Sequence, residues 1–173
     1  LKTYIRTVDS EHCWKYYMAS KPMGLNGSTL GLFGLGKIGR AVARRARGFG
    51  LRVLAVDTHA DEQQAAELGV IITDAKTLLR ESDVISNHMN LTAENRHFFD
   101  DAGFAAMEKH PIFLNVSRGG SVDEAALVRA LDNGLIRAAG LDVLEAEKPD
   151  LEKCALIGRE NVILTPHAAF YSA

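Results

Sequence analysis

The chain has 173 residues, of which 47% are hydrophobic and 24% are charged, a balance typical of a folded globular domain and not of a disordered protein. Its net charge of −2 gives no electrostatic reason to expect nucleic acid or an anionic membrane as a partner. No apolar run approaches the ~20 residues of a membrane span. Cys13 and Cys154 form no CxxC pair, so neither a metal site nor a disulfide framework is indicated, and a reducing, cytoplasmic setting is expected.

From about residue 29 onward, short apolar runs alternate with longer amphipathic stretches. Strands that alternate with helices predict parallel βαβ units, and their nearly continuous apolar character predicts a sheet that is covered on both faces. We therefore predict a doubly wound parallel α/β sheet of about seven strands over residues 24–173, preceded by a helical segment over 1–23. The strands are expected at 29–34, 51–57, 69–74, 82–89, 111–117, 136–144 and 161–167, and the helices at 37–50, 61–69 and 123–134.

The first of these helices has apolar side chains at helical spacing. Ile38, Val42 and Ala46 fall on one face, which we expect to pack against the sheet. The arginines of this helix are expected to lie away from that face, and the glycines at 48 and 50 suit the end of the helix.

Gly34-Leu35-Gly36-Lys37-Ile38-Gly39 forms a GxGxxG pattern between a predicted strand and a predicted helix. Gly34 would permit a tight turn, Gly36 would let a pyrophosphate approach the backbone, and Gly39 would allow close helix–strand packing. The phosphates would then lie at the start of the helix, near Lys37 and Ile38, where free N–H groups favour anions. The pattern thus predicts a Rossmann-type dinucleotide site rather than glycines that only form turns.

Asp57 closes the second predicted strand, 18 residues after Gly39. A carboxylate there would accept hydrogen bonds from the adenosine ribose hydroxyls and repel a 2′-phosphate. Thr58 and His59, the next residues, offer no arginine to hold such a phosphate, so NAD is favoured over NADP. A YxxxK pair at Tyr17 and Lys21, of the kind used by short-chain dehydrogenases, precedes the glycine loop instead of following it. We therefore interpret Tyr17 as a packing residue and Lys21 as a solvated one.

Polar side chains also follow the later strands, at the carboxyl ends where open α/β sheets bind ligands. Arg118 comes just after strand 111–117, and Asp142, Glu145 and Glu147 stand at or beyond the end of strand 136–144. His167 ends the last strand. Taken singly, each of these residues could be a surface or loop residue, but together they predict one site.

Five segments in this order, "GLGKIGR", "SDVISNHMNLTAENRHFF", "LNVSRGGSVDEAALVRAL", "AGLDVLEAEKP" and "TPHAAFYS", resemble the D-isomer-specific 2-hydroxyacid dehydrogenase family over residues 25–172. The ending "TPHAAFYS" is most similar to the branch of that family that includes the C-terminal binding proteins, which are NAD-sensing transcriptional corepressors. The resemblance implies an NAD-binding domain of an enzyme that transfers a hydride between NAD(H) and a D-2-hydroxy acid or 2-keto acid.

The resemblance also assigns roles to residues. The catalytic set maps to Arg118, Glu147 and His167, and Glu147 is chosen over Glu145 because the family's acid lies five residues beyond the position of Asp142. Asp142 matches the residue that holds the nicotinamide amide. The remaining cofactor contacts map to Asn90, Thr92, Val116 and Ser117, with Arg118 and His167 beside them; Asn90 replaces the proline of the family's HxPLT segment.

These residue types suit the reduction of a 2-keto acid. Arg118 offers a fixed fork of donors to the carboxylate and the carbonyl oxygen. Histidine exchanges protons near neutral pH, which suits His167 to donate a proton to that oxygen. Glu147, as an anionic neighbour, would stabilise the imidazolium form and fix the tautomer.

The family's enzymes have a second, substrate-binding domain, and a helix that follows the histidine loop; both are absent from this chain. We therefore expect a fragment that binds NAD(H) but turns over little or no substrate. The alternatives are a corepressor-like NAD-sensing module and another dehydrogenase class, the latter disfavoured because formate dehydrogenases carry an amide at the position of Glu147. No metal is implied. The family implies a homodimer, to which Trp14, Tyr16 and Tyr17 are expected to contribute.

Overall fold

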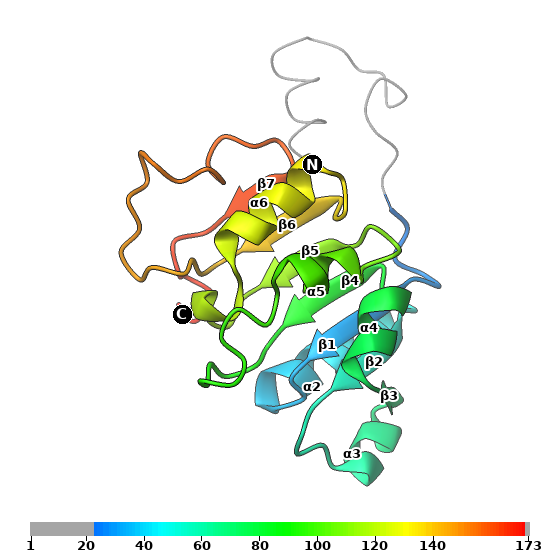
Figure 1. The fold of residues 1–173 in the computed structure, drawn as a ribbon. Coiled ribbons are helices and arrows are strands. Elements are labelled where there is room, and N and C mark those ends of the chain that lie inside the picture. The colour runs from blue at the N-terminus through cyan, green and yellow to red at the C-terminus, as the bar shows by residue number, and fades with distance from the viewer. Residues whose placement is uncertain (1–22, 172–173) are drawn as a thin grey trace.

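The computed structural model describes residues 23–171, so the predicted helical segment, with its aromatic residues and the YxxxK pair, lies outside the described part. Seven parallel strands form one sheet in the order β3-β2-β1-β4-β5-β6-β7 (Figure 1). This confirms the predicted doubly wound parallel sheet. The strands are β1 (Thr29–Phe33), β2 (Arg52–Val56), β3 (Val70–Ile72), β4 (Val84–Asn87), β5 (Ile112–Asn115), β6 (Ala138–Leu141) and β7 (Val162–Leu164).

The chain runs outward from β1 to β3 in one direction and from β4 to β7 in the other, which places the switch in strand order between β1 and β4. The helices between the strands are α2 (Lys37–Gly48), α3 (Glu62–Glu67), α4 (Ala75–Glu81), α5 (Asp101–Ala105) and α6 (Glu124–Asp132), with a 3-10 turn η2 (Gly119–Ser121) ahead of α6. None of the helices in residues 23–171 is long and apolar enough to cross a membrane.

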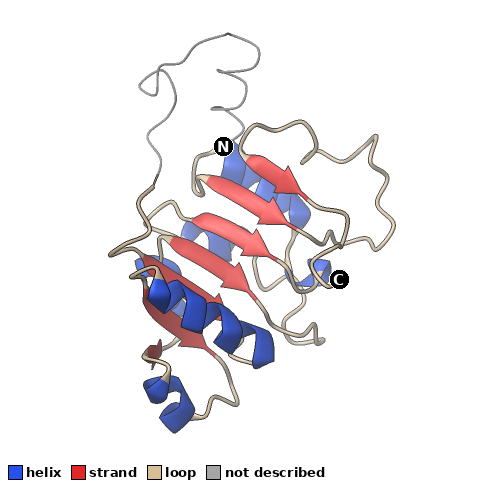
Figure 2. Ribbon diagram, turned by 180° about the vertical axis from the view of Figure 1, so that it is seen from behind, coloured by secondary structure: helices blue, strands red, loops and turns tan. Residues whose placement is uncertain are grey.

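Side chains alternate between the two faces of the sheet and form a separate core on each. Phe33 of β1 packs on one face with α4, α5 and α6, while its neighbour Leu32 packs on the other with α2 and α3. Figures 1 and 2 show these two faces from opposite sides. Seen from behind, α2 crosses the β1–β2 half of the sheet, and no described helix covers that face of β5–β7 (Figure 2).

The buried face of α2 differs from the predicted one. Ile38 is 65% exposed and Val42 is only partly buried, whereas Gly39, Ala43 and Ala46 are buried. A Cβ atom on Gly39 would lie 2.2 Å from the Gly34 carbonyl oxygen, so the helix starts very close to the sheet. Small residues therefore face the sheet, and the larger Ile38 is turned outward.

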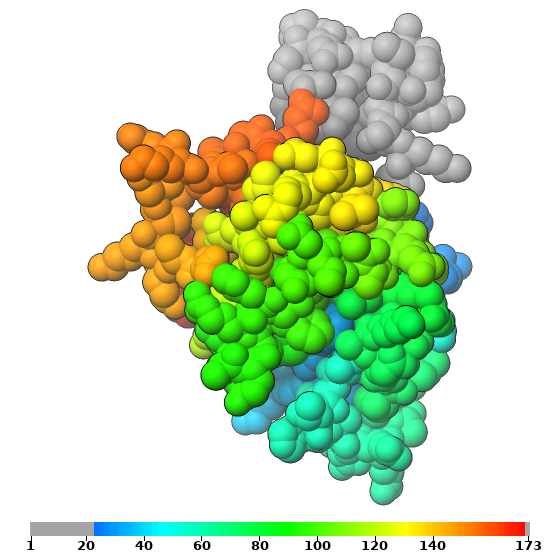
Figure 3. Space-filling view, in the orientation of Figure 1, coloured from blue at the N-terminus to red at the C-terminus, as the bar shows by residue number. Residues whose placement is uncertain are grey.

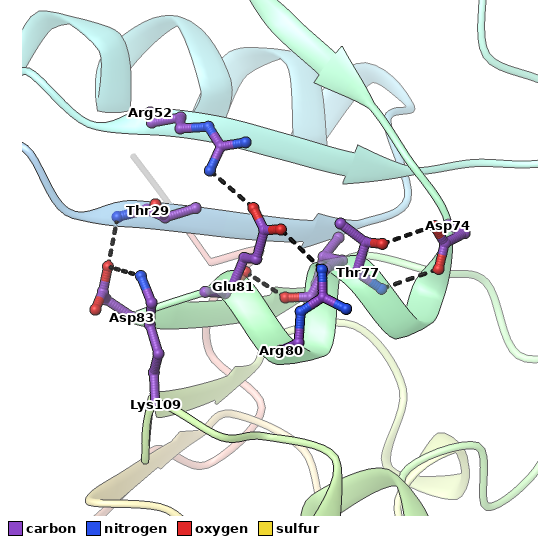
Figure 4. A network of polar contacts seen from close by, with 10 residues as sticks. Thr29, Arg52, Asp74, Thr77, Arg80, Glu81, Asp83 and Lys109 are labelled. Atoms are coloured by element: carbon purple, nitrogen blue, oxygen red, sulfur yellow. Dashed lines mark hydrogen bonds and ion pairs between the residues drawn. The ribbon is translucent and has the colours of Figure 1, made fainter.

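The amino edge of the sheet is closed by polar contacts (Figure 4). The Asp83 carboxylate accepts hydrogen bonds from the Thr29 backbone N–H at 2.8 Å and the Lys109 Nζ at 3.4 Å. Glu81 pairs with Arg52 and Arg80, each at 3.0 Å. These charges hold α4 and β4 against β1 and β2. Because they are paired with one another, we expect ligand contacts at the opposite, carboxyl edge of the sheet.

Two helices, α4 and α5, were not predicted, and the other three agree with the sequence. α5 has five residues and begins at an N-cap, Asp100, whose side chain accepts from the Gly103 N–H. Helices α3 and α6 begin in the same way at Asp61 and Asp123. The strands are confirmed but shorter than predicted, since only their central residues pair with neighbours.

Candidate active site

The glycine loop has the tight geometry expected from the sequence. Gly34 has φ +95°, which side chains rarely adopt, and a Cβ atom there would lie 2.8 Å from the His88 carbonyl oxygen. Gly39 touches the loop as described above. Around Gly36, in contrast, a Cβ atom would meet nothing within 4 Å, which leaves open space on the outer side of the loop.

The start of α2 faces that space. Gly36 is its N-cap and supplies no side-chain cap, and no acidic residue stands in the first turn. The Arg40 N–H bonds back to the Gly36 carbonyl at 3.0 Å, so the N–H groups that precede it in the first turn point toward the open side. The positive end of the helix dipole adds to this. These residues fit a bound pyrophosphate.

Asp57 lies just after β2 and beside the glycine loop. One carboxylate oxygen accepts from the Leu35 N–H at 2.7 Å and the other from the His59 N–H at 2.8 Å. Both oxygens keep a further lone pair for a ligand hydroxyl. The structure therefore brings the predicted ribose acceptor to the predicted phosphate loop.

Arg118 lies just after β5, in an exposed position, and its Nη1 donates to the Ser117 carbonyl at 2.8 Å. The following Gly119 is buried, and a Cβ atom there would lie 1.8 Å from the Leu144 carbonyl oxygen. This close approach holds the Arg118 segment against the chain that leaves β6. That chain carries Glu147, so two of the predicted catalytic residues come from adjoining segments.

Asp142 follows β6 and organises the turn after β7. Its carboxylate accepts hydrogen bonds from the Thr165 hydroxyl and, at 2.9 Å each, from the Ala168 and Ala169 N–H groups. Burial raises the pKa of Asp142, but these hydrogen bonds and the nearby His167 outweigh burial and hold the pKa below its ordinary value. The carboxylate is therefore ionised at neutral pH.

His167 stands at the centre of that turn, with φ +51°. Its backbone N–H donates to the Asp142 backbone carbonyl at 2.9 Å, and its ring meets the Phe170 ring edge-on with centroids 5.7 Å apart. A left-handed backbone is costly for a non-glycine residue and is often found at functional sites.

Arg118, Glu147 and His167 line one cavity of about 540 Å³ at the carboxyl ends of β5, β6 and β7. Asp142 lines it as well, and apolar side chains from the β6–β7 segment form its other wall. Figure 3 shows this segment, in orange, protruding from the edge of the molecule. The described contacts include no hydrogen bond between Glu147 and His167, so the structure brings the two residues into one cavity without joining them.

Glu145, the alternative acid, is committed elsewhere. Its carboxylate pairs with Arg96 at 2.8 Å and His97 at 2.7 Å, and its backbone N–H donates to the Glu124 carboxylate. It does not line the cavity. This geometry favours Glu147 as the acid of the site.

The segment after β4 carries the predicted contacts Asn90 and Thr92, both of which are exposed. Asn95 shapes this segment, because its amide donates to the Asn90 carbonyl at 2.7 Å and accepts from the Thr92 N–H at 2.8 Å. The preceding His88 is partly buried, and burial lowers its pKa; its Nε2 lies 3.0 Å from the Ser86 hydroxyl.

The same segment is joined to β5. The Ser117 hydroxyl donates to the Met89 carbonyl at 2.5 Å, and Val116 is 39% exposed beside it. Three buried polar residues also connect these segments and were not predicted, namely Asn87, Asn115 and Ser121. The only signal of Asn87 and Asn115 in the sequence is a polar side chain at a strand end, and Ser121, in the turn η2, has none. Within residues 23–171, no group of three or more His, Cys, Asp or Glu side chains could hold a metal ion.

A family model described as "D-isomer specific 2-hydroxyacid dehydrogenase, NAD binding domain" matches residues 1–169. The chain belongs to this family. It is 47% identical over 143 residues to a glyoxylate reductase of Korarchaeum cryptofilum. The matched stretch covers 83% of this chain and 43% of that relative. A hydroxypyruvate reductase of Thermotoga maritima is 43% identical over 86% of the chain and 48% of its own length.

Solved structures of the family share the fold. The apo-structure of D-lactate dehydrogenase from Escherichia coli matches with a TM-score of 0.87 and 38% identity over 98% of this chain and 53% of that one. An NAD-complexed D-isomer specific 2-hydroxyacid dehydrogenase from Lactobacillus delbrueckii matches with a TM-score of 0.86 and 31% identity, over 99% and 56% of the two chains. The present chain is thus a Rossmann-type NAD-binding domain that spans about half the length of its relatives. These relatives are reductases and dehydrogenases, which does not support the corepressor-like alternative.

Proposed function

We propose that this chain is the cofactor-binding half of an NAD-dependent enzyme that interconverts a D-2-hydroxy acid and a 2-keto acid. The observation that carries the proposal is the single cavity lined by Arg118, Glu147 and His167, which opens at the same sheet edge as the glycine loop. An acid, a base and a fixed cation are the groups that this reaction requires. Their placement beside a dinucleotide site connects the chemistry to NAD.

In the proposed cofactor site, the first turn of α2 holds the pyrophosphate and Asp57 the adenosine ribose. Asn90, Thr92, Val116 and Ser117 line the path of the nicotinamide half, and Asp142 holds its amide. Bound NADH supplies the hydride that reduces the keto carbon.

The residues of the cavity then serve the other half of the reaction. The Arg118 guanidinium binds the substrate carboxylate and polarises the carbonyl. His167 donates a proton to the carbonyl oxygen as the alcohol forms, and Glu147 stabilises the imidazolium before that transfer. In the direction of oxidation, His167 takes the hydroxyl proton back.

Cofactor binding is tested by titrating the chain with NADH and NADPH and following nicotinamide fluorescence. We expect saturable NADH binding that is at least about tenfold tighter than NADPH binding, because Asp57 repels a 2′-phosphate and Thr58 and His59 carry no guanidinium. Equal affinity for the two nucleotides would contradict the role given to Asp57.

Turnover is tested in a full-length protein that contains this chain, with glyoxylate, hydroxypyruvate, pyruvate and phosphohydroxypyruvate as substrates and NADH absorbance as the signal. We expect reduction of at least one of these acids by the full-length protein, and binding without measurable turnover by the 173-residue chain. Hydride transfer by the isolated chain would refute the fragment interpretation, and binding without any turnover in the full-length protein would refute the enzymatic one.

We also propose a cytoplasmic homodimer. The composition and the isolated cysteines favour the compartment. The sheet face that no described helix covers supports the dimer, since Ile163 on this face is 50% exposed and Ile112 and Leu114 are only partly buried. A monomer mass by light scattering would contradict the dimer, and recovery of the protein outside the cytoplasmic fraction would contradict the location.

A further inference from the structure

Three polar side chains are buried together between the ends of β4 and β5, and the reaction described above does not use them. Asn87 and Ser121 are 0% exposed and Asn115 is 1% exposed. We call them the Asn–Ser cluster. Burying amide and hydroxyl groups is costly unless each finds a hydrogen-bond partner, so the arrangement of these partners shows what the cluster holds.

On one side the cluster holds the main chain of Arg118. The Asn115 Nδ2 and the Ser121 hydroxyl both donate to the Arg118 carbonyl oxygen, at 3.0 and 2.8 Å. The Asn115 Oδ1 accepts from the Ser117 N–H at 3.2 Å. The residue that carries the guanidinium is therefore fixed at its carbonyl and through its neighbour.

On the other side the cluster holds the segment after β4. The Asn87 Oδ1 accepts from the Met89 N–H at 3.1 Å. The Asn87 Nδ2 donates to the Ser121 hydroxyl at 2.8 Å and to the Asn115 Oδ1 at 3.1 Å. Asn87 thus joins the segment that carries Asn90 and Thr92 to the two side chains that hold Arg118.

The partners fix the orientation of each amide. Turning the Asn115 amide over would point its oxygen at the Arg118 carbonyl and its NH₂ at the Ser117 N–H. Turning the Asn87 amide over would set its NH₂ against the Met89 N–H. Each side chain therefore has one favourable orientation, and a buried, fully bonded network is rigid.

We infer that Asn87, Asn115 and Ser121 are positioning residues, which fix the Arg118 main chain relative to the Met89–Thr92 segment so that the carboxylate site and the nicotinamide path keep one geometry. This inference rests on the proposed function for the roles of the two segments. The mechanical connection itself can be tested without it.

The test compares Ser121→Ala with Ser82→Ala. Ser82 is also 0% exposed and donates one hydrogen bond to a carbonyl, that of Leu78 at 2.7 Å, but it lies at the amino edge of the sheet. Ser82→Ala loses one buried hydrogen bond, whereas Ser121→Ala loses both the bond donated to Arg118 and the bond accepted from Asn87. Both variants are therefore expected to lower the melting temperature, Ser121→Ala by more. In the full-length protein, Ser121→Ala is expected to raise KM for the keto acid about tenfold with NADH affinity changed less than about twofold, whereas Ser82→Ala changes neither.

Asn87→Leu removes the connection to both segments and is expected to weaken NADH binding by the 173-residue chain as well as to raise KM. Ser121→Cys keeps a weak donor of similar size and is expected to restore part of the loss. If Ser121→Ala and Ser82→Ala give the same kinetics, the cluster stabilises the fold only and the inference is wrong.

Hydrogen exchange separates this result from a failure of the proposed function. Ser121→Ala is expected to speed backbone exchange in peptides covering both 86–92 and 114–121, and Ser82→Ala in neither. This outcome would support the connection even if the unsubstituted protein bound no NADH, in which case only the proposed function would fail. Faster exchange in 114–121 alone would overturn the connection.

Discussion

Replacing Gly36 or Gly39 by alanine adds the same methyl group to the glycine loop, but the two methyl groups meet different surroundings. The Cβ atom at 39 would lie 2.2 Å from the Gly34 carbonyl oxygen, which is backbone and cannot rotate away. The Cβ atom at 36 would meet nothing within 4 Å. The first variant therefore tests packing, and the second tests ligand approach.

For Gly39→Ala, the contact falls about 1.2 Å short of the 3.4 Å at which ordinary van der Waals contact begins, so α2 must shift outward by a similar distance. Overpacking of this kind costs ~1–3 kcal/mol. For a domain of this size, that cost corresponds to a melting temperature lowered by about 2–12 °C. Because the shift also opens the loop, NADH affinity is expected to fall together with stability.

For Gly36→Ala, φ is −68° and ψ is −163°, an extended conformation that alanine adopts freely. Stability is therefore expected to change by less than ~0.5 kcal/mol. The methyl group occupies the open space where the pyrophosphate would meet the first turn of α2. We expect NADH to bind at least about tenfold more weakly, a loss of ~1.4 kcal/mol.

Thermal unfolding followed by circular dichroism and NADH titration by fluorescence measure the two effects. Gly48→Ala, at the other end of α2, is the matched control, because a Cβ atom there meets nothing within 4 Å and its position lies away from the loop. It is expected to raise stability slightly and to leave affinity unchanged. Unchanged affinity in Gly36→Ala would refute the assignment of this space to the pyrophosphate.

Further predictions concern the titrating and catalytic groups. Burial lowers the pKa of His88 below its ordinary value of 6.5, so the unfolded chain binds more protons than the folded one. Stability should therefore fall as the pH drops below about 6.5. His88→Gln should make the melting temperature depend less on pH between about pH 7 and 5. Asp142 has a lowered pKa despite its burial, so its ionised form stabilises the fold above the unfolded pKa of 3.8. This stabilisation is lost as the pH falls through the folded pKa. Asp142→Asn should therefore lower the melting temperature at pH 7, and the difference from the unsubstituted chain should shrink below about pH 4. In the full-length protein, Glu147→Gln should lower kcat about a hundredfold or more. The main effect of Glu145→Gln should be on stability, at most ~1 kcal/mol, because its ion pairs are partly exposed. Equal losses of kcat in the two variants would contradict the choice of Glu147 as the acid.

Some parts of the fold were beyond reach of the sequence for a physical reason. Hydrophobicity at helical spacing selected Ile38 for the buried face of α2, but the close contact at Gly39 requires small side chains there. Periodicity also needs more residues than the five of α5, which begins because Asp100 caps it and not because of an apolar stripe. The strands were predictable because a sheet covered on both faces needs nearly continuous apolar runs.

In the candidate site, too, some contacts could be predicted from the sequence and others could not. The glycine pattern and Asp57 predict the contact between β1, α2 and β2, because Gly34 and Gly39 each meet a geometric demand that a side chain could not. The pattern does not predict the hydrogen bond between Asn87 and Ser121, because these two residues lie 34 positions apart in sequence. Such a hydrogen bond depends on which strands become neighbours, and β4 and β5 are neighbours only once the sheet has formed.

Asp142 shows how the proposed nicotinamide contact and the proposed proton donor, His167, are connected in this chain. Its backbone carbonyl accepts from the His167 N–H and its carboxylate from the two residues that follow the histidine, so one residue holds the turn from both sides. This helps to keep His167 at φ +51°, which costs free energy without such support. The residue assigned to the nicotinamide amide therefore also sets where the histidine ring lies. A cofactor that engages Asp142 would therefore contact the residue that supports His167, the proposed proton donor. Sequence spacing alone does not reveal this connection.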